Sequence, residues 1–317
     1  MMTAAQEPSH SPLNDRTGDA YPSRFLPDPQ LLPRLDPVIH GPVERAGPLD
    51  AEQLRHYDEN GYLVLEGFFN GAEIEALQAE LTRLRRCHDG LDPDTLILEP
   101  DDRELRSVFA IHEQSGVMNR LARDARLLDI ARFLLADDVY VHQSRLNYKP
   151  GFFGKEFYWH SDFETWHVED GMPRMRALSM SITLTDNTEF NGPLMLVPGS
   201  HRTYVTCVGE TPPEHYKQSL RRQEYGVPDP VSLTTLTERG GLVAPKGPAG
   251  TVLLFECNMM HGSNSNISPL PRSNAFVVYN AIGNAVVEPF GGQAPRPEYI
   301  ATRERIEPLI EHRGRFA

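Results

Sequence analysis

The sequence predicts a mainly β protein of the α+β class, in which a layer of helices flanks a β-sandwich or an open barrel. Helical patterns dominate before Asp137, and strand-like runs separated by turn clusters dominate after it. Helices and strands do not alternate regularly along the chain, which disfavours a doubly wound α/β fold. The length of 317 residues suits one large domain or two small ones.

The first 45 residues are predicted to form a proline-rich, partly disordered arm. Nine of the 27 prolines fall within the first fifty residues, and proline interrupts helices and central strands alike. We expect residues 1–20 to be an unstructured tail and the rest to run extended over the surface, with Phe25 and Leu31 docked on it. Residues 46–317 are then expected to form a single domain.

Three helices and one short strand are expected in the first half of the chain. Asp50 and Asn70 precede segments with apolar periodicity and can cap the first two helices. Gly61 ends the first helix, and residues 62–65 then form a short strand. The third helix is expected over residues 117–135. The second helix has one core-facing stripe of apolar residues at spacings of three and four: Ile74, Leu77, Leu81 and Leu84.

The second half of the chain is expected to supply most of the β structure. Strand-like runs follow one another there, separated by turns rich in glycine, proline and asparagine. A short run at 157–159 directly precedes His160. The longer strands are expected at 139–149, 177–185, 192–197, 251–257 and 273–281.

Composition excludes several classes of protein. The chain has 31 Lys and Arg against 44 Asp and Glu, and its net charge of −13 argues against nucleic acid and anionic membranes as partners. No apolar run approaches the ~18 residues that span a bilayer, and no secretory signal is visible at the N-terminus. Cys87, Cys207 and Cys257 lack metal-site or disulfide spacing. A reducing, cytoplasmic location is therefore expected.

A candidate metal site lies at His160 and Asp162. Both follow a strand-like stretch, and in extended chain residues i and i+2 point to the same face and can reach one ion. A second His-x-Asp pair, His56 and Asp58, falls in the first predicted helix, where the two side chains point about 200° apart. His261, expected in a polar turn just beyond a core strand, can supply a third ligand.

The chemistry of this set depends on whether the three residues meet. Two histidines and one carboxylate with open positions form the facial triad that suits non-haem Fe(II) and O2 chemistry. Arg272, eleven residues after His261, can clamp a carboxylate through two parallel hydrogen bonds. The spacing alone leaves a second interpretation equally open, in which two histidines and an ion pair lie on the surface.

A resemblance to a known family lies in the fourteen-residue block HSDFETWHVEDGMP, which runs from His160 to Pro173. This block resembles the signature segment of the ectoine hydroxylases, members of the phytanoyl-CoA dioxygenase family of Fe(II)- and 2-oxoglutarate-dependent oxygenases. The segments 143–149 and 191–201 are similar to the same family, as is His261 with Arg272 downstream. The resemblance covers roughly residues 45–310.

The resemblance implies a fold and a reaction. The implied fold is a double-stranded β-helix of the jelly-roll or cupin type, at about residues 137–285, flanked by helices. The implied reaction is hydroxylation of ectoine to 5-hydroxyectoine by O2, with 2-oxoglutarate converted to succinate and CO2. Related halogenases carry a small residue where Asp162 stands, so the carboxylate favours hydroxylation. The family also tends to form homodimers.

The same resemblance assigns the metal and cosubstrate residues. His160, Asp162 and His261 would bind iron, and Arg272 would meet the far carboxylate of 2-oxoglutarate, with Lys149 on the same side. Period-two alternation supports a polar environment there, because four polar residues share one face of the strand and face either solvent or, as we favour, a polar cavity: Gln143, Arg145, Asn147 and Lys149.

Ectoine is a small cyclic amidinium that carries a carboxylate. The resemblance assigns Gln143 to contact with ectoine and Trp166 to its stabilisation, through a cation–π contact of roughly 0.5–2 kcal/mol. A core position is the alternative for Trp166. Thr165 is a weaker candidate, and His201 is interpreted as a structural residue rather than a fourth ligand.

Two other functions compete with this one. The first is a related oxygenase acting on another small amino-acid-like substrate, which the retained segment 163–166 disfavours. The second is a cupin-like binding module whose metal is structural or absent, which the intact ligand set and Arg272 disfavour. Oxygen uptake with and without ectoine separates the three.

Overall fold

The main sheet of the protein is antiparallel and has seven strands. The computed structural model describes residues 18–44, 46–88, 90–98, 105–212, 214 and 225–316. Neighbouring strands of this sheet pair in the following order: β2 (Tyr62–Leu65), β10 (Val252–Glu256), β7 (Ala177–Thr183), β12 (Arg272–Ala281), β5 (Val139–Lys149), β4 (Leu105–Phe109) and β3 (Leu96–Leu98).

Two smaller antiparallel sheets complete the β structure. One has the order β6 (Phe157–Ser161), β11 (Met260–Ser263) and β8 (Leu194–Leu196), and the other pairs β1 (Leu31–Pro33) with β9 (Thr203–Val205). Apolar side chains of β8 pack against alternate residues of the main sheet, Leu253, Phe255 and Phe276. The three-stranded sheet therefore faces the main sheet, as in a jelly roll.

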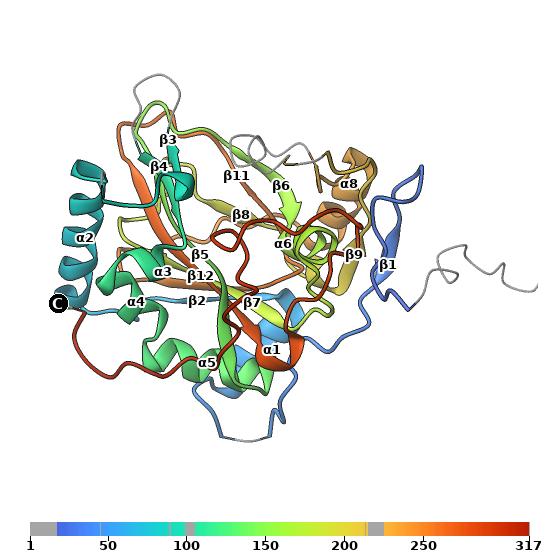
Figure 1. The fold of residues 1–317 in the computed structure, drawn as a ribbon, viewed down its shortest axis with the longest axis horizontal. Coiled ribbons are helices and arrows are strands. Elements are labelled where there is room, and N and C mark those ends of the chain that lie inside the picture. The colour runs from blue at the N-terminus through green and yellow to red at the C-terminus, as the bar shows by residue number, and fades with distance from the viewer. Residues whose placement is uncertain are drawn as a thin grey trace, which may run out of the picture.

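Helices cover the other face of the main sheet. The alternate residues Leu254, Val277 and Met180 point away from the small sheet and join a core that the helices complete. The helices are α1 (Ala51–Asn60), α2 (Gly71–Arg86), α3 (Ile111–Gln114), α4 (Gly116–Ala122), α5 (Ala125–Leu135), α6 (Asp162–Thr165) and α8 (Pro230–Gly240). Of these, α6 and α8 lie on the side of the small sheet (Figure 1).

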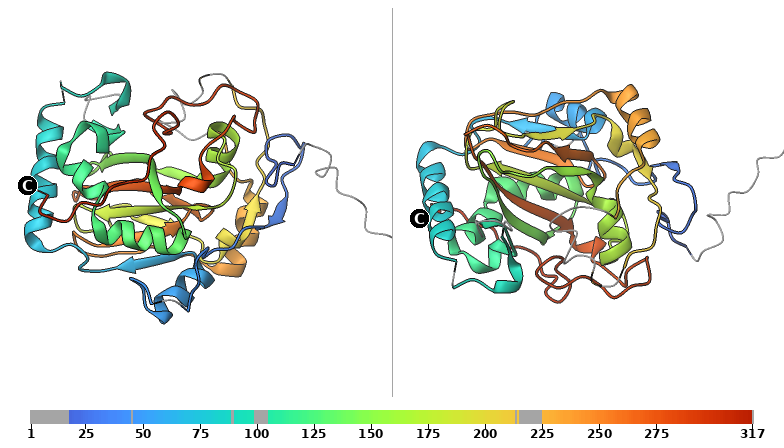
Figure 2. Two further views of the ribbon diagram at one scale, coloured as in Figure 1. Left: turned by 60° about the horizontal axis from the view of Figure 1, so that its bottom comes forward. Right: turned by 90° about the horizontal axis from the view of Figure 1, so that it is seen from above.

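The two ends of the molecule are marked by different segments. In both views of Figure 2, α2 lies at one end with the C-terminus beside it, and the N-terminal strand β1 lies at the opposite end. Phe316 packs on Phe69 just ahead of α2, with ring centroids 5.6 Å apart, which fixes the C-terminal segment there. No helix in the described ranges is both long and apolar enough to cross a membrane.

The predicted class, a mainly β core flanked by helices, is confirmed, as are the first two helix caps. Asp50 and Asn70 each form a complete capping box, and Gly61 ends α1 with a positive φ of 79°. The prediction of a single third helix over residues 117–135 is wrong, because this range contains two helices, α4 and α5. Asp124 interrupts the pattern in extended-like geometry and caps α5 by accepting a hydrogen bond from the Arg126 amide.

The boundaries of the β structure also differ from expectation. Strands β2, β4 and β3 join the main sheet although they lie ahead of residue 137. In the arm, Leu31 pairs with Val205, but the expected anchor Phe25 is 42% exposed. Tyr21 is the anchor instead: it has no exposed surface, and its hydroxyl donates to Asp36 at 2.7 Å. Residues 1–17 of the arm lie outside the described residues.

Candidate active site

Three predicted ligands meet between the two larger sheets. His160 on β6 lies directly opposite His261 on β11, so strand pairing brings their rings to a centroid distance of 4.2 Å. Asp162 directly follows β6, and its carboxylate oxygens lie 3.6 Å and 3.9 Å from Nε2 of His160 and His261. The three ligand atoms all lie within 4.8 Å of one another. The surface interpretation of these residues is therefore excluded.

Backbone contacts prepare both imidazoles for a metal. Nδ1 of His160 lies 2.7 Å from the Tyr158 carbonyl, and Nδ1 of His261 lies 2.9 Å from the Met259 carbonyl. Each Nδ1 must carry the proton to donate to a carbonyl, which leaves Nε2 as a free lone pair aimed at the carboxylate. Burial further favours the neutral ring and lowers the pKa of His261 to about 4. This donor set fits Fe(II).

The carboxylate is held in its charged form. Burial would raise the pKa of Asp162, but a positive charge on His261 or His160 and the permanent charge of Arg145 hold it well below its ordinary value. Arg145 lies on β5 of the main sheet, on the polar face that alternation predicts, with its guanidinium 5.1 Å from the Phe276 ring. Its position between Gln143 and Lys149 in that alternating pattern was the signal that could have marked it as a site residue.

A cationic end of the site is built from two strands of the main sheet. Lys149 on β5 and Arg272 on β12 are paired across the sheet and are 4% and 6% exposed. Nζ of Lys149 donates to Ser263 Oγ at 2.8 Å on the small sheet. Within the described residues, Nε of Arg272 is buried without a hydrogen-bond partner, and neither side chain forms an ion pair. Buried cations are normally paired, so this end suits a carboxylate from outside.

The protonation of Lys149 provides a test of whether the cationic end of the site binds a carboxylate. Burial, with Arg272 and Arg106 nearby, lowers its pKa to about 6, and Glu156 opposes this only weakly. The ligand-free side chain is thus largely neutral at pH 7.5, and a bound carboxylate restores its charge. We expect 2-oxoglutarate binding to take up close to one proton there, and its affinity to fall as the pH rises above about 6.

Titration calorimetry in two buffers of different ionisation enthalpy measures this proton uptake. Lys149→Met should bind 2-oxoglutarate with no uptake at the same pH, and it serves as the matched control. Binding to the unmodified protein without uptake of a proton would contradict the role of Lys149.

The predicted substrate residues lie on two different elements. Gln143 on β5 donates to the Ile300 carbonyl at 2.8 Å. Trp166 begins a π-helix, Trp166–Asp170, that continues α6. It is 2% exposed, packs with Phe163, and meets the edge of the His142 ring at 5.2 Å. Oγ1 of Thr165 is buried and has no hydrogen-bond partner in the part of the chain that the structure describes.

Two expectations about local geometry were wrong. His261 lies on strand β11 rather than in a turn, because Met260–Ser263 pairs with both β6 and β8. Asp162 begins α6 rather than continuing extended chain, although its carboxylate still reaches His160 because Ser161 between them is extended. The competing pair His56 and Asp58 lies in α1, as predicted.

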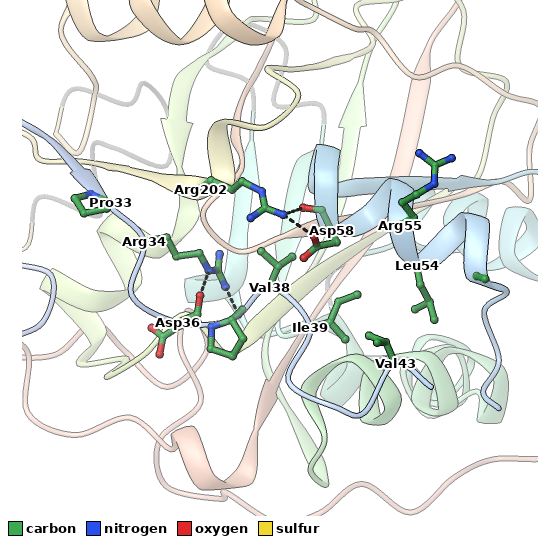
Figure 3. A pocket seen from close by; sticks show the side chains of 12 residues that line it. Pro33, Arg34, Asp36, Val38, Ile39, Val43, Leu54, Arg55, Asp58 and Arg202 are labelled. Atoms are coloured by element: carbon green, nitrogen blue, oxygen red, sulfur yellow. Dashed lines mark hydrogen bonds and ion pairs between the residues drawn. The ribbon is translucent and has the colours of Figure 1, made fainter. Parts of the chain in front are cut away.

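A separate cavity of about 660 Å³ lies between the arm and α1, and Figure 3 shows the side chains that line it. Arg202 pairs with Asp58 at 2.6 Å, and Arg34 pairs with Glu256 at 2.8 Å. None of the predicted site residues lines this cavity. The interpretation of His201 as a structural residue agrees with its position nearby. It is fully buried, and its Nε2 lies 3.1 Å from the Asp58 carbonyl.

Comparison with known proteins identifies the family of this chain. The family model described as phytanoyl-CoA dioxygenase matches residues 57–274, more than half of the chain. The chain belongs to the phytanoyl-CoA dioxygenase family. Two relatives within it are the ectoine dioxygenases of Sphingopyxis alaskensis and Bordetella bronchiseptica. The first is 59% identical and the second 56%, over 93% and 91% of this chain and 97% and 94% of those proteins.

Solved structures agree with this membership of the phytanoyl-CoA dioxygenase family. EctD from S. alaskensis with 2-oxoglutarate and 5-hydroxyectoine matches with a TM-score of 0.87 and 55% identity, over 94% of this chain and 100% of that chain. The same protein with bound Fe matches with a TM-score of 0.86 and 54% identity, with the same coverage. The carbocyclase SnoK, at 19% identity, 86% and 97% coverage and a TM-score of 0.57, shares the fold.

Proposed function

We propose that this protein is an Fe(II)- and 2-oxoglutarate-dependent dioxygenase that hydroxylates ectoine. The reaction consumes ectoine, 2-oxoglutarate and O2 and yields 5-hydroxyectoine, succinate and CO2. One observation carries the proposal most directly: His160, Asp162 and His261 come within 4.8 Å of one another. Lys149 bonds to Ser263, two residues beyond His261 on the same strand, and among the described residues neither Lys149 nor its neighbour Arg272 has an ion-pair partner. The ectoine dioxygenases that share more than half of its sequence support the choice of substrate.

The metal ligands in this proposal are His160, Asp162 and His261. Iron bound there supplies the activation of O2 and the oxidising power for C–H hydroxylation. The chain itself fixes the two imidazoles through carbonyl hydrogen bonds and keeps the carboxylate ionised. The histidines are 7% and 3% exposed, so bulk water is largely kept from the reacting centre.

The cosubstrate residues are Arg272 and Lys149. A planar guanidinium matches a carboxylate through two parallel hydrogen bonds, and the unpartnered Nε of Arg272 is free for one of them. The ammonium of Lys149 adds a second positive charge on the same side. Together they would hold the far carboxylate of 2-oxoglutarate and leave its keto acid end directed at the metal.

The substrate residues in this proposal are Gln143, Trp166 and Thr165. Gln143 offers an amide to ectoine, and the unpartnered hydroxyl of Thr165 can bond to a ring nitrogen or carboxylate. Trp166 would place its electron-rich face against the amidinium. Hydroxylation at one ring carbon requires that these three contacts fix the orientation of a small and otherwise mobile ligand.

Replacing Trp166 by alanine is expected to weaken ectoine binding by about 1–2 kcal/mol and to uncouple succinate formation from hydroxylation. Iron and 2-oxoglutarate binding should persist, and Trp166→Phe should lose less because an aromatic face remains. Melting temperature, iron content and the ratio of succinate to hydroxyectoine are measured on the same variants.

The core position of Trp166 makes a different prediction for the same measurements. A purely structural tryptophan would lose several kcal/mol of stability on truncation and would weaken all bindings together. A fully stable Trp166→Ala variant with unchanged coupling would contradict both roles.

Product analysis tests the proposed function. The purified protein is incubated with Fe(II), 2-oxoglutarate and air, with and without ectoine, and hydroxyectoine and succinate are quantified. Equimolar products that depend on ectoine support the proposal. Succinate formation coupled only to another small amino acid points to a different oxygenase, and no turnover with any substrate points to a binding module.

Cellular setting and assembly complete the proposal. We propose that the enzyme works in the cytoplasm, where the free thiols of Cys87, Cys207 and Cys257 stay reduced. We also propose a homodimer, on the resemblance to the family. Light scattering of the purified protein measures the mass in solution against that of one chain.

A further inference from the structure

A buried network of charges surrounds the helical segment that follows Asp162. Glu164 and Glu169 are each 1% exposed, and Arg24 of the N-terminal arm contacts both. Its Nε and Nη2 donate to the two oxygens of Glu164 at 2.9 Å and 2.7 Å, and its Nη1 donates to Glu169 at 2.6 Å. From the other side, Arg296 pairs with Asp170 and lies 3.6 Å from Glu169.

The spacing of the two glutamates has a geometric meaning. Residues five apart point about 140° apart on an α-helix, so one guanidinium does not readily bridge them there. Here the Gly171 amide donates to the Trp166 carbonyl, which is the five-residue spacing of a π-helix. This wider turn brings Glu164 and Glu169 to the same side, where Arg24 meets both. The bridge therefore stabilises the wide turn over the α-helical alternative.

The residues between the two glutamates are those assigned to substrate. Thr165 ends α6 and Trp166 begins the π-helix, so both lie between the two glutamates and loss of the bridge would release the segment on either side of them. The arm is held firmly enough to act on this segment. Ser23 donates to Glu164 at 2.6 Å, and the Arg24 amide donates to the Cys207 carbonyl at 2.9 Å.

The backbone of Arg24 adds a second indication that its placement is specific. Its φ is 65°, in the left-handed region that bulky residues rarely adopt. Its side chain is nevertheless buried, with three contacts to carboxylate oxygens. Such a conformation persists only where the surroundings determine it.

We propose that Arg24 is a positioning residue, which holds the π-helix in its wide-turn register by bridging Glu164 and Glu169. By anchoring the segment on both sides of Thr165 and Trp166 it holds these two residues in place for ectoine, and this part rests on the proposed function. The N-terminal arm is thereby a working part of the substrate site, although Arg24 itself is assigned no contact with substrate.

Two variants test this role. In Arg24→Lys a single ammonium replaces the fork and cannot serve both carboxylates equally. In Glu169→Gln the two-point contact of Arg24 with Glu164 still docks the arm, while the charged contacts of residue 169 with Arg24 and, at 3.6 Å, with Arg296 are both lost. The chain has two tryptophans, so Trp159→Phe is used as the background and leaves Trp166 as the single tryptophan, which is excited selectively.

We expect both variants to shift the emission of Trp166, to raise the KM for ectoine by about fivefold or more, and to increase succinate formed per hydroxyectoine. Iron content and the KM for 2-oxoglutarate should stay within about twofold of the background protein. Thr211→Val is the matched control, because it removes a contact of Arg24 that does not involve the π-helix. It should change none of these quantities.

Other outcomes overturn the proposal. A lower melting temperature with unchanged emission and coupling would make Arg24 a structural anchor only. Failure of both variants to fold would show that the network serves folding rather than positioning. If the unmodified protein does not hydroxylate ectoine, the proposed function fails, while the emission of Trp166 still decides whether the bridge controls this segment.

Discussion

Alanine at His160, Asp162 or His261 is expected to abolish ectoine-dependent turnover while the fold stays intact. In the proposed site each residue would supply one of the three ligands that the described residues bring together. Loss of a residue that merely supports a ligand costs about 10- to 100-fold in metal affinity, so loss of a ligand itself should cost more. Metal analysis and succinate formation measure the effect, and circular dichroism checks the fold.

The chain contains its own control for this prediction. His56 and Asp58 repeat the His-x-Asp spacing on α1, where a regular helix points the two side chains apart. His56→Ala should therefore keep normal iron content and activity. A variant of His160, Asp162 or His261 with stoichiometric iron and near-normal turnover would remove that residue from the ligand set.

Arg272→Ala is expected to raise the KM for 2-oxoglutarate by about 10- to 150-fold, with a much smaller effect on the KM for ectoine. A hydrogen-bonded contact between charged groups is worth roughly 1.5–3 kcal/mol, which corresponds to that range. The guanidinium is buried on β12, and its Nε has no hydrogen-bond partner among the described residues. Steady-state kinetics with each substrate varied in turn measure both constants.

Graded variants sharpen the assignment of Arg272. Arg272→Lys keeps the charge but loses the planar fork, so it should fall between the unmodified protein and Arg272→Ala. Arg55 on α1 is 63% exposed and is not assigned to the cosubstrate site. Arg55→Ala should therefore change neither KM. An unchanged KM for 2-oxoglutarate in Arg272→Ala would exclude Arg272 from the cosubstrate site.

Local sequence signals correctly predicted the elements that depend on residues close together in the chain. The strand expected at 139–149 is β5 with the same bounds, because its β-branched and aromatic residues are flanked by clear turns. The caps at Asp50 and Asn70 bond within three residues of themselves, so no distant contact was needed to infer them. The break at Asp124 was missed because the apolar spacing continues across it.

The elements that the sequence missed depend on distant partners. Strand β11 is only four residues long and contains Gly262, so its local preference is weak, and pairing with β6 and β8 is what makes it a strand. Arg24 was overlooked because the arm is rich in proline and its partners Glu164 and Glu169 lie about 140 residues away. No local pattern links such residues.

The sequence by itself determined the chemistry of this protein. The block from His160 to Pro173, together with His261 and Arg272, identified the family and predicted the ligand set. Only the tertiary structure decided how these residues work together. Pairing of β6 with β11 places residues 160 and 261 opposite each other. Ion pairs of Arg24 with Glu164 and Glu169 join the N-terminal arm to α6 and the π-helix. Residue types decide which metal and which charges can bind, whereas distances between remote segments are decided by strand pairing and buried ion pairs.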